Sequence, residues 1–308
     1  MQQVLIDQDV QPRIEPQQAL QTDDSAAILR FAAEALDAHL AAVLVTLVEI
    51  RGGAARALGA QMVVRADGRY CGYVSGGCVE AAAAYEALEV MASGKDRLVS
   101  YGEGSPYLDI VLPCGGGITL LFHRLRAAQP LHQVLESLAQ RNPATLCYLP
   151  SFQRLTRVDA AQPTGWQDDA FMMRYQPNTR IVVYGRSVEA QATASIAQAA
   201  GYDVQSGDEV KAQAIDAFTA VILLYHDLDR ELPALLAALQ STPFYIGALG
   251  SQRTHARRAE KLLTLGFSPS EIARIKAPIG IFAQARDART LALSIIADVA
   301  AARLEAID

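Results

Sequence analysis

The sequence lacks the short patterns that would assign it to a familiar class of enzyme. Its 308 residues include four cysteines, but they form no CxxC pair and no zinc-ribbon spacing. It contains no HExxH or Walker pattern and no Ser-His-Asp order typical of a hydrolase. The formal net charge of −6 argues against nucleic-acid binding, which favours a basic domain.

Long apolar runs and targeting patterns are also missing. The longest apolar run, Ala41 to Val48, is far too short to span a bilayer. Residues 1–24 are polar and rich in glutamine, and they lack the charged-then-apolar pattern of a secretion signal, so we expect a flexible leader. A chain without an export signal is expected in the cytoplasm, with reduced thiols and no membrane contact.

The order of helical and strand patterns predicts two domains. From residue 25 to 178, helices at 25–40 and 79–92 and a hairpin at Asp67-Gly68 predict an α+β sheet domain. From 179 to 308, strands and helices alternate, which is typical of a Rossmann-like parallel sheet covered on both faces. The predicted fold class is therefore α/β. The strands expected in the second domain are 181–184, 202–205, 221–225 and 244–248, and its longer helices are 187–200, 229–240, 252–265 and 285–304.

Two glycine-flanked cysteines are the most informative feature of the first domain. They lie in Ser75-Gly76-Gly77-Cys78-Val79-Glu80 and in Pro113-Cys114-Gly115-Gly116-Gly117. Glycine lets bare backbone approach a ligand closely and adopt positive φ. The first run precedes a helix, whose free amides attract anions. Two sulfur atoms beside two such loops indicate a phosphorylated, thiol-binding or metal-bearing ligand.

Each cysteine also has a purely structural interpretation. Cys78 could be a small buried residue under a turn, which is common for free cysteine. Packing alone would explain the sulfur of Cys114 but not the three glycines after it, so Cys114 has the stronger functional case. Cys71 and Cys147 lie inside predicted strands, and we expect both to fill the core. Glu80 lies near Cys78 and could bind NH groups of a ligand.

The nucleotide-binding pattern expected of a Rossmann-like domain is incomplete. The turn reads Gly185-Arg186-Ser187-Val188-Glu189-Ala190, in which serine replaces the second glycine. The acidic residue that should bind a ribose is also missing, because the next strand ends in Gln205-Ser206-Gly207. Arg186 could still meet a phosphate. The sequence therefore does not favour binding of NAD(P), and it indicates instead an α/β scaffold with a degenerate nucleotide site.

Two further features of the second domain admit a ligand or a structural role. Ser251 and Arg253 follow a glycine turn at a predicted helix start, and His255, Arg257, Arg258 and Lys261 extend a basic patch along that helix. The patch could hold a phosphate or an acidic protein surface, or it could be a solvated helix face. His226-Asp227 ends a predicted strand where ligands of such sheets collect, although a capping Asp beside a structural His is equally consistent.

Together these residues resemble the XdhC/CoxI family, the accessory factors of xanthine dehydrogenase. The resemblance runs from about Ala42 to Leu304. In the first domain the matching stretches are Gly59-Ala60-Gln61-Met62, Asp67-Gly68, Gly72 to Glu80 and Cys114-Gly115-Gly116. In the second domain they are His226-Asp227, Tyr245 to Ser251, Ala277 to Gly280 and Ala292 to Ile295. The ordered pair of glycine-flanked cysteines is its most specific part.

The resemblance implies a chaperone rather than an enzyme. Such a protein would bind molybdenum cofactor transiently, help it receive a terminal sulfur from a cysteine desulfurase, and insert it into a molybdenum hydroxylase. Amide-rich loops suit the cofactor phosphate, Glu80 suits the pterin, and Cys114 can face the sulfur-bound metal. A homodimer would shield the cofactor between its two copies. The implied binding residues are Ser75, Gly76, Gly77, Cys78, Glu80, Cys114, Gly115, Gly116, Gly185, Ser251 and Arg253, with Cys114 at the metal.

The departures from the family pattern fall mostly in the second domain. The turn Gly185-Arg186-Ser187 has fewer glycines than is usual, and Phe282 and Gln284 stand where an acid and a glycine are common. Three alternatives to the chaperone stay open. They are an NAD(P)-dependent oxidoreductase that uses the second domain, a sulfurtransferase with Cys114 as carrier, and a scaffold that bridges the client and the desulfurase.

Overall fold

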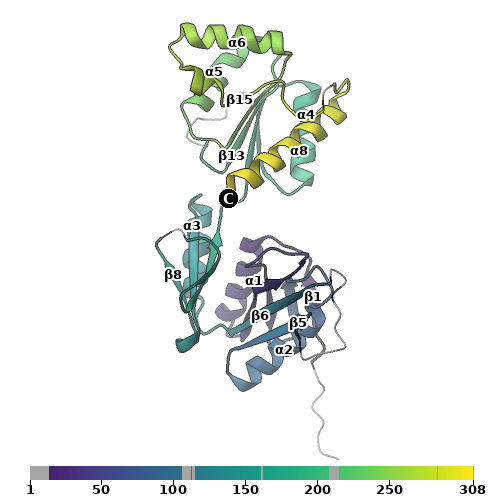
Figure 1. The fold of residues 1–308 in the computed structure, drawn as a ribbon, viewed down its shortest axis with the longest axis vertical. Coiled ribbons are helices and arrows are strands. Elements are labelled where there is room, and N and C mark those ends of the chain that lie inside the picture. The colour runs from purple at the N-terminus through teal and green to yellow at the C-terminus, as the bar shows by residue number, and fades with distance from the viewer. Residues whose placement is uncertain are drawn as a thin grey trace, which may run out of the picture. The chain divides into compact units, whose positions relative to one another are not determined.

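The computed structural model describes residues 14–105, 112, 115–160, 162–207, 215–282 and 284–307 (Figure 1). Pro113 and Cys114, on which one predicted site depends, lie outside the described residues. The chain divides into two compact units, Met1–Pro177 and Asn178–Asp308. Each unit has its own sheets and its own core.

The first unit is built on a six-stranded sheet in the order β1-β4-β3-β2-β6-β5. All neighbouring pairs are antiparallel except β1 with β4, which run parallel. The strands are β1 (Gln17–Leu20), β2 (Ala42–Arg51), β3 (Gln61–Arg65), β4 (Arg69–Gly72), β5 (Arg97–Gly102) and β6 (Gly117–Arg124). The predicted hairpin at Asp67-Gly68 is confirmed, since it joins β3 to β4 and Gly68 has φ +80°.

Strand β1 corrects one expectation. Residues 17–20 were predicted to lie in a flexible leader, but they pair with β4, with Gln17 opposite Arg69 and Gln18 opposite Tyr70. All four side chains of β1 are exposed, so the strand has no apolar alternation for sequence analysis to detect. Backbone hydrogen bonding to β4, rather than burial, holds this edge strand.

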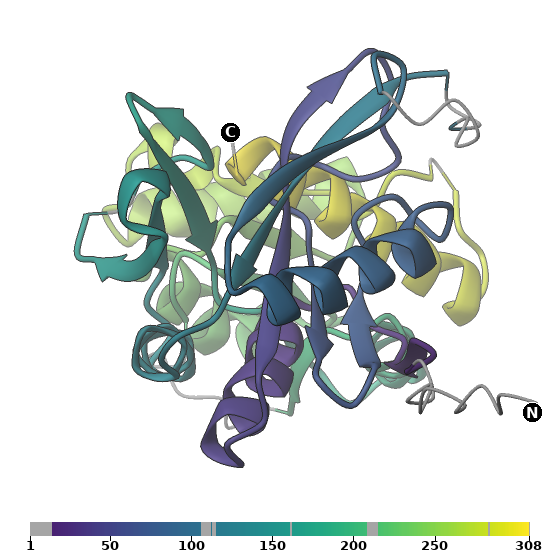
Figure 2. The same cartoon turned by 90° about the horizontal axis from the view of Figure 1, so that it is seen from below.

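Helices α1 (Ser25–Asp37) and α2 (Glu80–Ser93) cover opposite faces of this sheet. Successive residues of β2 alternate between the two faces: Leu44 and Val48 pack toward α1, and Val43 and Val45 pack toward α2. Because both faces are covered, the strand reads as a continuous apolar run in the sequence. In the view from below, α2 lies in front of these strands (Figure 2).

A second sheet completes the first unit. It is antiparallel, in the order β8-β7-β10-β9. Its side chains share one core with α1 and with α3 (Gln129–Ala139). The strands are β7 (Ala144–Leu149), β8 (Arg154–Val158), β9 (Gly165–Gln167) and β10 (Ala170–Tyr175), and a short 3-10 helix, η1 (Pro150–Phe152), follows β7.

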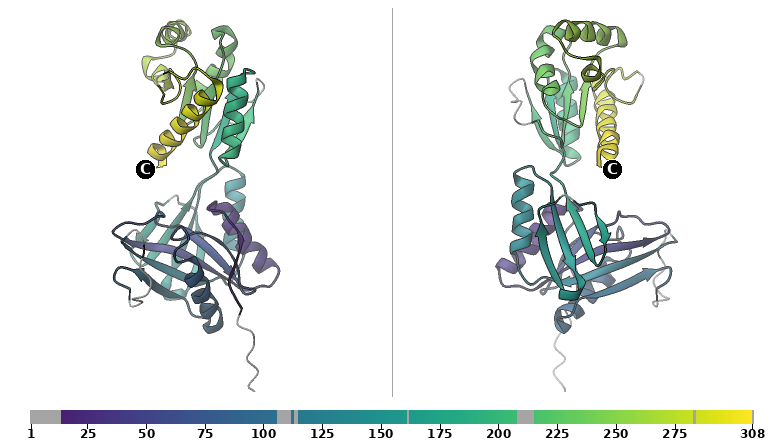
Figure 3. Two further views of the ribbon diagram at one scale, coloured as in Figure 1. Left: turned by 90° about the vertical axis from the view of Figure 1, so that its right-hand side faces the viewer. Right: turned by 60° about the vertical axis from the view of Figure 1, so that its left-hand side comes forward.

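The second unit is a parallel sheet in the order β12-β11-β13-β14-β15, which confirms the Rossmann-like prediction. The strands are β11 (Arg180–Tyr184), β12 (Asp203–Ser206), β13 (Thr219–Leu223), β14 (Tyr245–Ala248) and β15 (Ile275–Lys276). The helices are α4 (Val188–Ala199), α5 (Leu228–Leu239), α6 (Gln252–Thr264), α7 (Pro269–Ile272) and α8 (Ala288–Ile307). Helices α4 and α8 lie side by side on one face, and α5 packs on the other (Figure 3).

The connections of this sheet define its switch point. From β11 the chain crosses through α4 to β12 on one side, whereas β13 leads through α5 to β14 on the other. Ligands of open parallel sheets bind at the carboxyl ends of the two strands where the winding reverses. Here those strands are β11 and β13, which pair directly from Arg180 with Thr219 to Tyr184 with Leu223.

Candidate functional site

Three loops of the first unit meet beside Cys78. One connects β2 to β3, one connects β4 to α2, and one connects β5 to β6. A Cβ on Gly76 would lie 3.5 Å from the Cβ of Ala55, and a Cβ on Gly116 would lie 2.2 Å from the carbonyl oxygen of Gly53. The loop after β2 therefore contacts both glycine-rich loops.

The meeting point of these loops encloses a cavity of about 270 Å³. Its lining is mostly small or apolar: Ala54, Ala55, Val74, Ser75, Cys78, Leu112 and Ile118. Cys78 is exposed, so the interpretation of this residue as buried under a turn is wrong. A thiol on the wall of an apolar cavity is suited to a soft, poorly hydrated partner such as a sulfur-bound metal centre.

Five of the six amides from Val74 to Val79 do not point to solvent, because the carboxylate of Glu80 binds them. Oε1 of Glu80 accepts hydrogen bonds from the backbone amides of Val74 (2.8 Å), Ser75 (2.8 Å) and Gly76 (3.2 Å). Oε2 accepts from the amides of Gly77 (2.8 Å) and Val79 (3.2 Å) and from the Ser75 hydroxyl (2.7 Å). The positive φ of Gly76 (+89°) and Gly77 (+116°) turns these amides toward one anion.

This arrangement corrects the predicted role of the loop. The amides of Ser75, Gly76 and Gly77 were expected to receive an anionic ligand, and Glu80 was expected to bind a pterin. Instead, Glu80 is 3% exposed and fills the amide cluster itself. Burial acts to raise the pKa of Glu80, but the hydrogen bonds from Ser75 and Val74 outweigh it and hold the pKa below its usual value.

The two glycines of the second loop have different surroundings. Gly115 has φ +70°, and a Cβ added there would meet no atom within 4 Å. Gly116 packs against the backbone of Arg51 and Gly53, and its carbonyl accepts a hydrogen bond from the amide of Glu103. Gly115 is therefore open toward its surroundings, whereas Gly116 is required for close packing of backbone on backbone.

The other two cysteines within the described residues fill the core, as predicted. Cys71 is fully buried on β4, and Cys147 is 5% exposed on β7. Burial raises the pKa of the Cys71 thiol to about 12, so this thiol stays protonated near neutral pH.

A second cavity of the first unit, of about 400 Å³, shares Ala55 with the Cys78 cavity. Gln61, from the stretch that resembles the XdhC/CoxI family, lies at its wall together with Tyr175. The Tyr175 hydroxyl donates to Oε1 of Gln61 (2.9 Å), and Nε2 of Gln61 donates to the hydroxyl of Thr46 (3.3 Å). Arg56 and Arg174 add positive charge, although Arg56 is paired with Asp23 at 3.0 Å. Sequence analysis missed this cavity because its walls come from both sheets.

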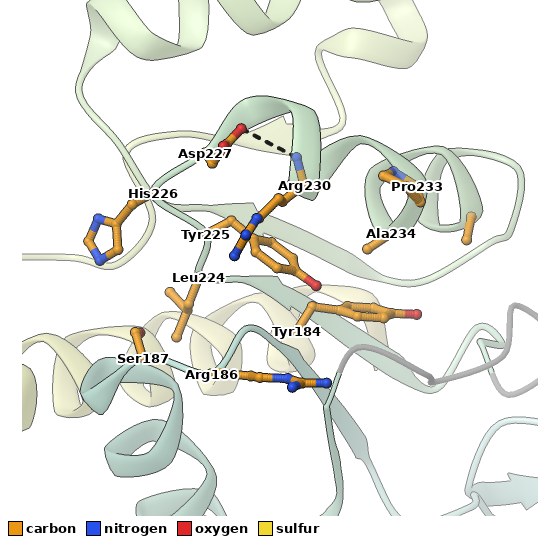
Figure 4. A pocket seen from close by; sticks show the side chains of 11 residues that line it. Tyr184, Arg186, Ser187, Leu224, Tyr225, His226, Asp227, Arg230, Pro233 and Ala234 are labelled. Carbon is orange, nitrogen blue, oxygen red and sulfur yellow. Dashed lines mark hydrogen bonds between the residues drawn. The ribbon is translucent and has the colours of Figure 1, made fainter.

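In the second unit, a pocket of about 720 Å³ lies at the switch point. Figure 4 shows the rings of Tyr184 and Tyr225 near each other, with Arg186 and Arg230 on either side. Sequence analysis missed Tyr184 and Tyr225, although both lie at predicted strand ends. The pocket is lined by Tyr184, Arg186, Ser187, Leu224, Tyr225, His226, Asp227, Arg230, Pro233, Ala234 and Ala237.

In the turn where a nucleotide-binding pattern was sought, the residues make contacts within the chain. A Cβ on Gly185 would lie 2.7 Å from the carbonyl oxygen of Leu224, so this glycine allows close contact between two strand ends. Ser187 caps α4 by accepting a hydrogen bond from the amide of Ala190. Glu189 lies in the first turn of α4. Hydrogen bonds from the Ser187 side chain and from the backbone amide of Glu189 lower the pKa of this carboxyl group, so the start of α4 carries a negative charge.

His226 and Asp227 have different roles at the end of the central strand. Asp227 caps α5 by accepting from the amides of Asp229 (2.8 Å) and Arg230 (3.4 Å), as the capping interpretation predicts. His226 is not a buried structural residue: its side chain is 71% exposed, and its Nε2 lies 3.9 Å from Oε2 of Glu189. The pair therefore combines a helix cap with an exposed imidazole at the pocket wall.

The predicted basic patch on α6 is smaller than its sequence indicates. Arg258 is 2% exposed and turns inward, where its Nη2 lies 3.0 Å from Oε2 of the buried Glu231. Lys261 pairs with Asp229. Ser251 caps α6 by accepting from the amide of Thr254 (3.3 Å), and none of Gly185, Ser251 and Arg253 lines the switch-point pocket. The structure therefore does not unite these three predicted site residues.

The described part of the chain holds neither a metal cluster nor a membrane-spanning helix. Between residues 14 and 307, apart from the gaps given above, no group of three or more His, Cys, Asp or Glu side chains could hold a metal ion. Over the same residues, no helix is both long enough and apolar enough to cross a membrane.

Comparison with known proteins places these features in a family. Residues 35–102 match the family described as XdhC and CoxI, and residues 181–299 match the XdhC Rossmann domain. The chain is 62% identical to the molybdenum cofactor insertion chaperone PaoD of Escherichia coli, over 94% of this chain and 92% of that protein. It is 23% identical to a probable xanthine dehydrogenase subunit of Bacillus subtilis, over 84% of this chain and 92% of that protein.

A solved structure has the same fold. It is described as a xanthine dehydrogenase from Bacillus halodurans, and it superposes with a TM-score of 0.71 at 20% identity, over 92% of this chain and 96% of that chain. The sequence matches in both units and the 62% identity over nearly the whole length establish kinship beyond the fold. This chain belongs to the XdhC and CoxI family.

Proposed function

We propose that this chain is a chaperone that binds molybdenum cofactor and inserts it into a molybdenum hydroxylase. The observation that carries the proposal is the exposed Cys78 thiol on the wall of an apolar cavity, beside the loop of Gly115 and Gly116. The proposal is supported by the 62% identity to a protein named as a molybdenum cofactor insertion chaperone. No Ser-His-Asp order or metal-ligand pattern in the sequence indicates catalysis, so we propose a maturation factor rather than an enzyme.

The cargo has a soft end and a polar end, and the Cys78 cavity suits the soft end. With a volume of about 270 Å³ and apolar walls, it can take the sulfur-bound metal region but not the whole cofactor. We retain Cys114 as the residue that faces the metal and Cys78 as the second thiol. We propose that binding is transient, because a chaperone has to release the cofactor to its client.

The polar end needs other hydrogen-bond donors than those first predicted. Glu80 already takes the amides of the Cys78 loop, and a phosphate there would meet a buried carboxylate. The adjoining cavity of about 400 Å³ offers Arg56 and Arg174 at its wall, and it shares Ala55 with the Cys78 cavity. We place the phosphate and pterin on that side of Ala55, because guanidinium groups pair well with phosphate.

The remaining parts of the proposal concern partners. We propose a molybdenum hydroxylase as client, in line with the name of the Bacillus subtilis relative, and a cysteine desulfurase as the source of the terminal sulfur. We place the protein in the cytoplasm and expect a homodimer, which sedimentation velocity would test. We expect the switch-point pocket not to bind NAD(P), since Glu189 puts a carboxylate in the first turn of α4, the helix end that a pyrophosphate would approach.

The test is to measure pterin carried by protein made in a molybdenum-replete host. Pterin released by denaturation is quantified by fluorescence and mass spectrometry for wild type, Cys78→Ala, Cys114→Ala and the control Cys147→Ala. Wild type and the control should retain pterin, Cys78→Ala less, and Cys114→Ala least.

Three outcomes would count against the proposal. Wild-type protein without pterin would leave the chaperone without its cargo. Equal loss in all three variants would indicate general destabilisation, because Cys147 is buried away from the cavity. A persulfide trapped on Cys114 together with catalytic turnover would indicate a sulfurtransferase instead.

A further inference from the structure

The hydrogen bonds of Glu80 clamp the backbone on both sides of Cys78. The amide of Gly77 donates to Oε2 of Glu80 at 2.8 Å, and the amide of Val79 donates to the same oxygen at 3.2 Å. The amide of Val79 also donates to the Ser75 hydroxyl at 2.9 Å. Cys78 therefore lies between two peptide groups that are both tied to one buried carboxylate.

The burial pattern of the loop also indicates that Glu80 holds the backbone around Cys78. Val74 and Val79 are fully buried, whereas Gly76, Gly77 and Cys78 are exposed between them. A Cβ on Gly77 would meet no atom within 4 Å, so packing does not hold the backbone at this residue. The carboxylate of Glu80 is the group that fixes it, because its six hydrogen bonds reach every residue from Val74 to Val79 except Cys78.

Burying a carboxylate in this position is costly unless hydrogen bonds to its charged form compensate for the lost hydration. An ionised group that is 3% exposed loses its hydration, and hydrogen bonds to the charged form must compensate. Bare backbone at two successive positive-φ glycines has few conformational restraints of its own. The internal anion supplies those restraints, and it leaves the reactive side chain of Cys78 exposed.

We propose that Glu80 is the positioning residue of the Cys78 thiol: it acts as an internal anion that holds the loop from Val74 to Val79 so that the thiol lines the apolar cavity. What the thiol is used for rests on the proposed function, but its placement does not. The ligand anion consequently binds elsewhere, since the amide cluster is occupied from within.

The experiment compares thiol environment and loop protection in wild type, Glu80→Gln, Ser75→Ala and the control Glu89→Gln. Glu89 lies on the same helix with its side chain exposed, so its variant makes the same chemical change outside the loop. Cys78 is alkylated with two neutral reagents, apolar N-phenylmaleimide and polar iodoacetamide, and the two rates are read from the Cys78 peptide by mass spectrometry. Hydrogen exchange of the amides from 74 to 79 is measured in parallel.

In folded wild type, the cavity should favour the apolar reagent relative to the same peptide in the denatured protein. Glu80→Gln should reduce this preference about tenfold and accelerate exchange of the loop amides by at least that factor, because an amide side chain loses the charge and presents donors to donors. Ser75→Ala removes one of the six hydrogen bonds to Glu80 and the hydroxyl that accepts from the Val79 amide, and it should give a smaller change in the same amides. Glu89→Gln should match wild type.

A Glu80→Gln protein that is folded and keeps the wild-type reagent preference and loop protection would overturn the proposal. If Glu80→Gln does not fold, Ser75→Ala decides: unchanged exchange at residues 74 to 79 would overturn it equally. No cofactor enters these measurements. A failure of cofactor retention therefore leaves this result standing, and a failure here leaves the cofactor test unaffected.

Discussion

At the scale of single residues, the loop beside the Cys78 cavity differs from its prediction in the role of its backbone amides. The glycines of this loop were predicted to expose backbone amides to a ligand. The amides are instead bound by a glutamate one to six residues along the chain, which a linear pattern does not reveal. A Gly-Gly pair closely followed by a glutamate at a helix start is the signal that could have indicated it.

The neighbouring glycines Gly115 and Gly116 provide a matched pair of substitutions. Gly115→Ala places a Cβ in open space and costs only the left-handed backbone conformation, about 1 kcal/mol. Gly116→Ala drives a Cβ to 2.2 Å from one carbonyl oxygen and 2.6 Å from another, so backbone must move. We expect its cost to be about 3 kcal/mol.

Urea unfolding of both variants would measure this difference. The order of the two costs is the decisive result: a Gly115→Ala protein less stable than Gly116→Ala would show that the loop after β2 does not pack on Gly116 as described. Pterin retention should show the opposite order: Gly115→Ala should retain less pterin than Gly116→Ala, because Gly115 is the glycine that is open to a ligand.

At the scale of elements, the two sheets of the first unit are joined by a buried polar cluster. Asp96, before β5, accepts hydrogen bonds from Nδ1 of His123 on β6 (2.5 Å) and from the hydroxyl of Tyr148 on β7 (2.9 Å). Its other oxygen accepts from the amide of Arg124 at 2.9 Å. The side chain of Asp96 is 3% exposed, so the cluster lies between the sheets and not at a ligand site.

Replacing Asp96 tests this junction and its pH dependence. Burial acts to raise the pKa of Asp96, but its hydrogen bonds to His123, Arg124 and Tyr148 prevail and lower it. A lowered pKa in the folded state stabilises the protein above the unfolded value of about 3.9, and this stability is lost as pH falls through the folded pKa. We expect Asp96→Asn to cost about 2 kcal/mol at pH 7.

The difference in unfolding free energy between wild type and Asp96→Asn should shrink as pH falls below about 4. Urea unfolding at a series of pH values measures it, and the other carboxylates cancel because both proteins contain them. A gap that stays constant down to about pH 2, well below the unfolded pKa, would show that the charge of Asp96 does not hold the two sheets together.

Which elements could be predicted depended on burial. Strands β11, β13 and β14 were found because a parallel sheet covered on both faces produces apolar runs, as at Ile181 to Tyr184. Strand β15 was missed because it has only two residues, of which Lys276 is exposed. Strand β1 was missed because its four residues are exposed. The basic patch on α6 was overestimated because the pairing of Arg258 with Glu231 spans two helices, 27 residues apart in the sequence.

At the scale of the whole molecule, the first unit has two cavities and the second unit has the switch-point pocket, and the sequence was most informative about the Cys78 cavity. Family likeness and glycine-flanked cysteines pointed to the loops that surround the Cys78 cavity. In the second unit, the stretch from Ala277 to Gly280 leads into a structural contact: the Ser294 hydroxyl accepts from the amides of Ile281 and Phe282, both at 2.8 Å, and anchors this loop to α8. A shared stretch in this family therefore marks packing as readily as binding.

The large pocket at the switch point leads to a prediction about nucleotides. A dinucleotide would have to bring its pyrophosphate to the start of α4, where Ser187 replaces the second glycine and its hydroxyl already caps the helix. The carboxylate of Glu189 at the same helix end repels a phosphate and takes the favourable position near the helix dipole. We therefore expect no binding of NADH or NADPH at micromolar concentration.

Isothermal titration of the full chain with NADH and NADPH tests this expectation, with Glu189→Gln as a companion variant. If the carboxylate is the obstacle, Glu189→Gln should bind either nucleotide more tightly than wild type, although Ser187 still limits the approach. Micromolar binding by wild type would reverse the argument, because the pocket between Arg186 and Arg230 would then hold a nicotinamide cofactor in spite of the charge at α4, and an oxidoreductase would become the better account of the second unit.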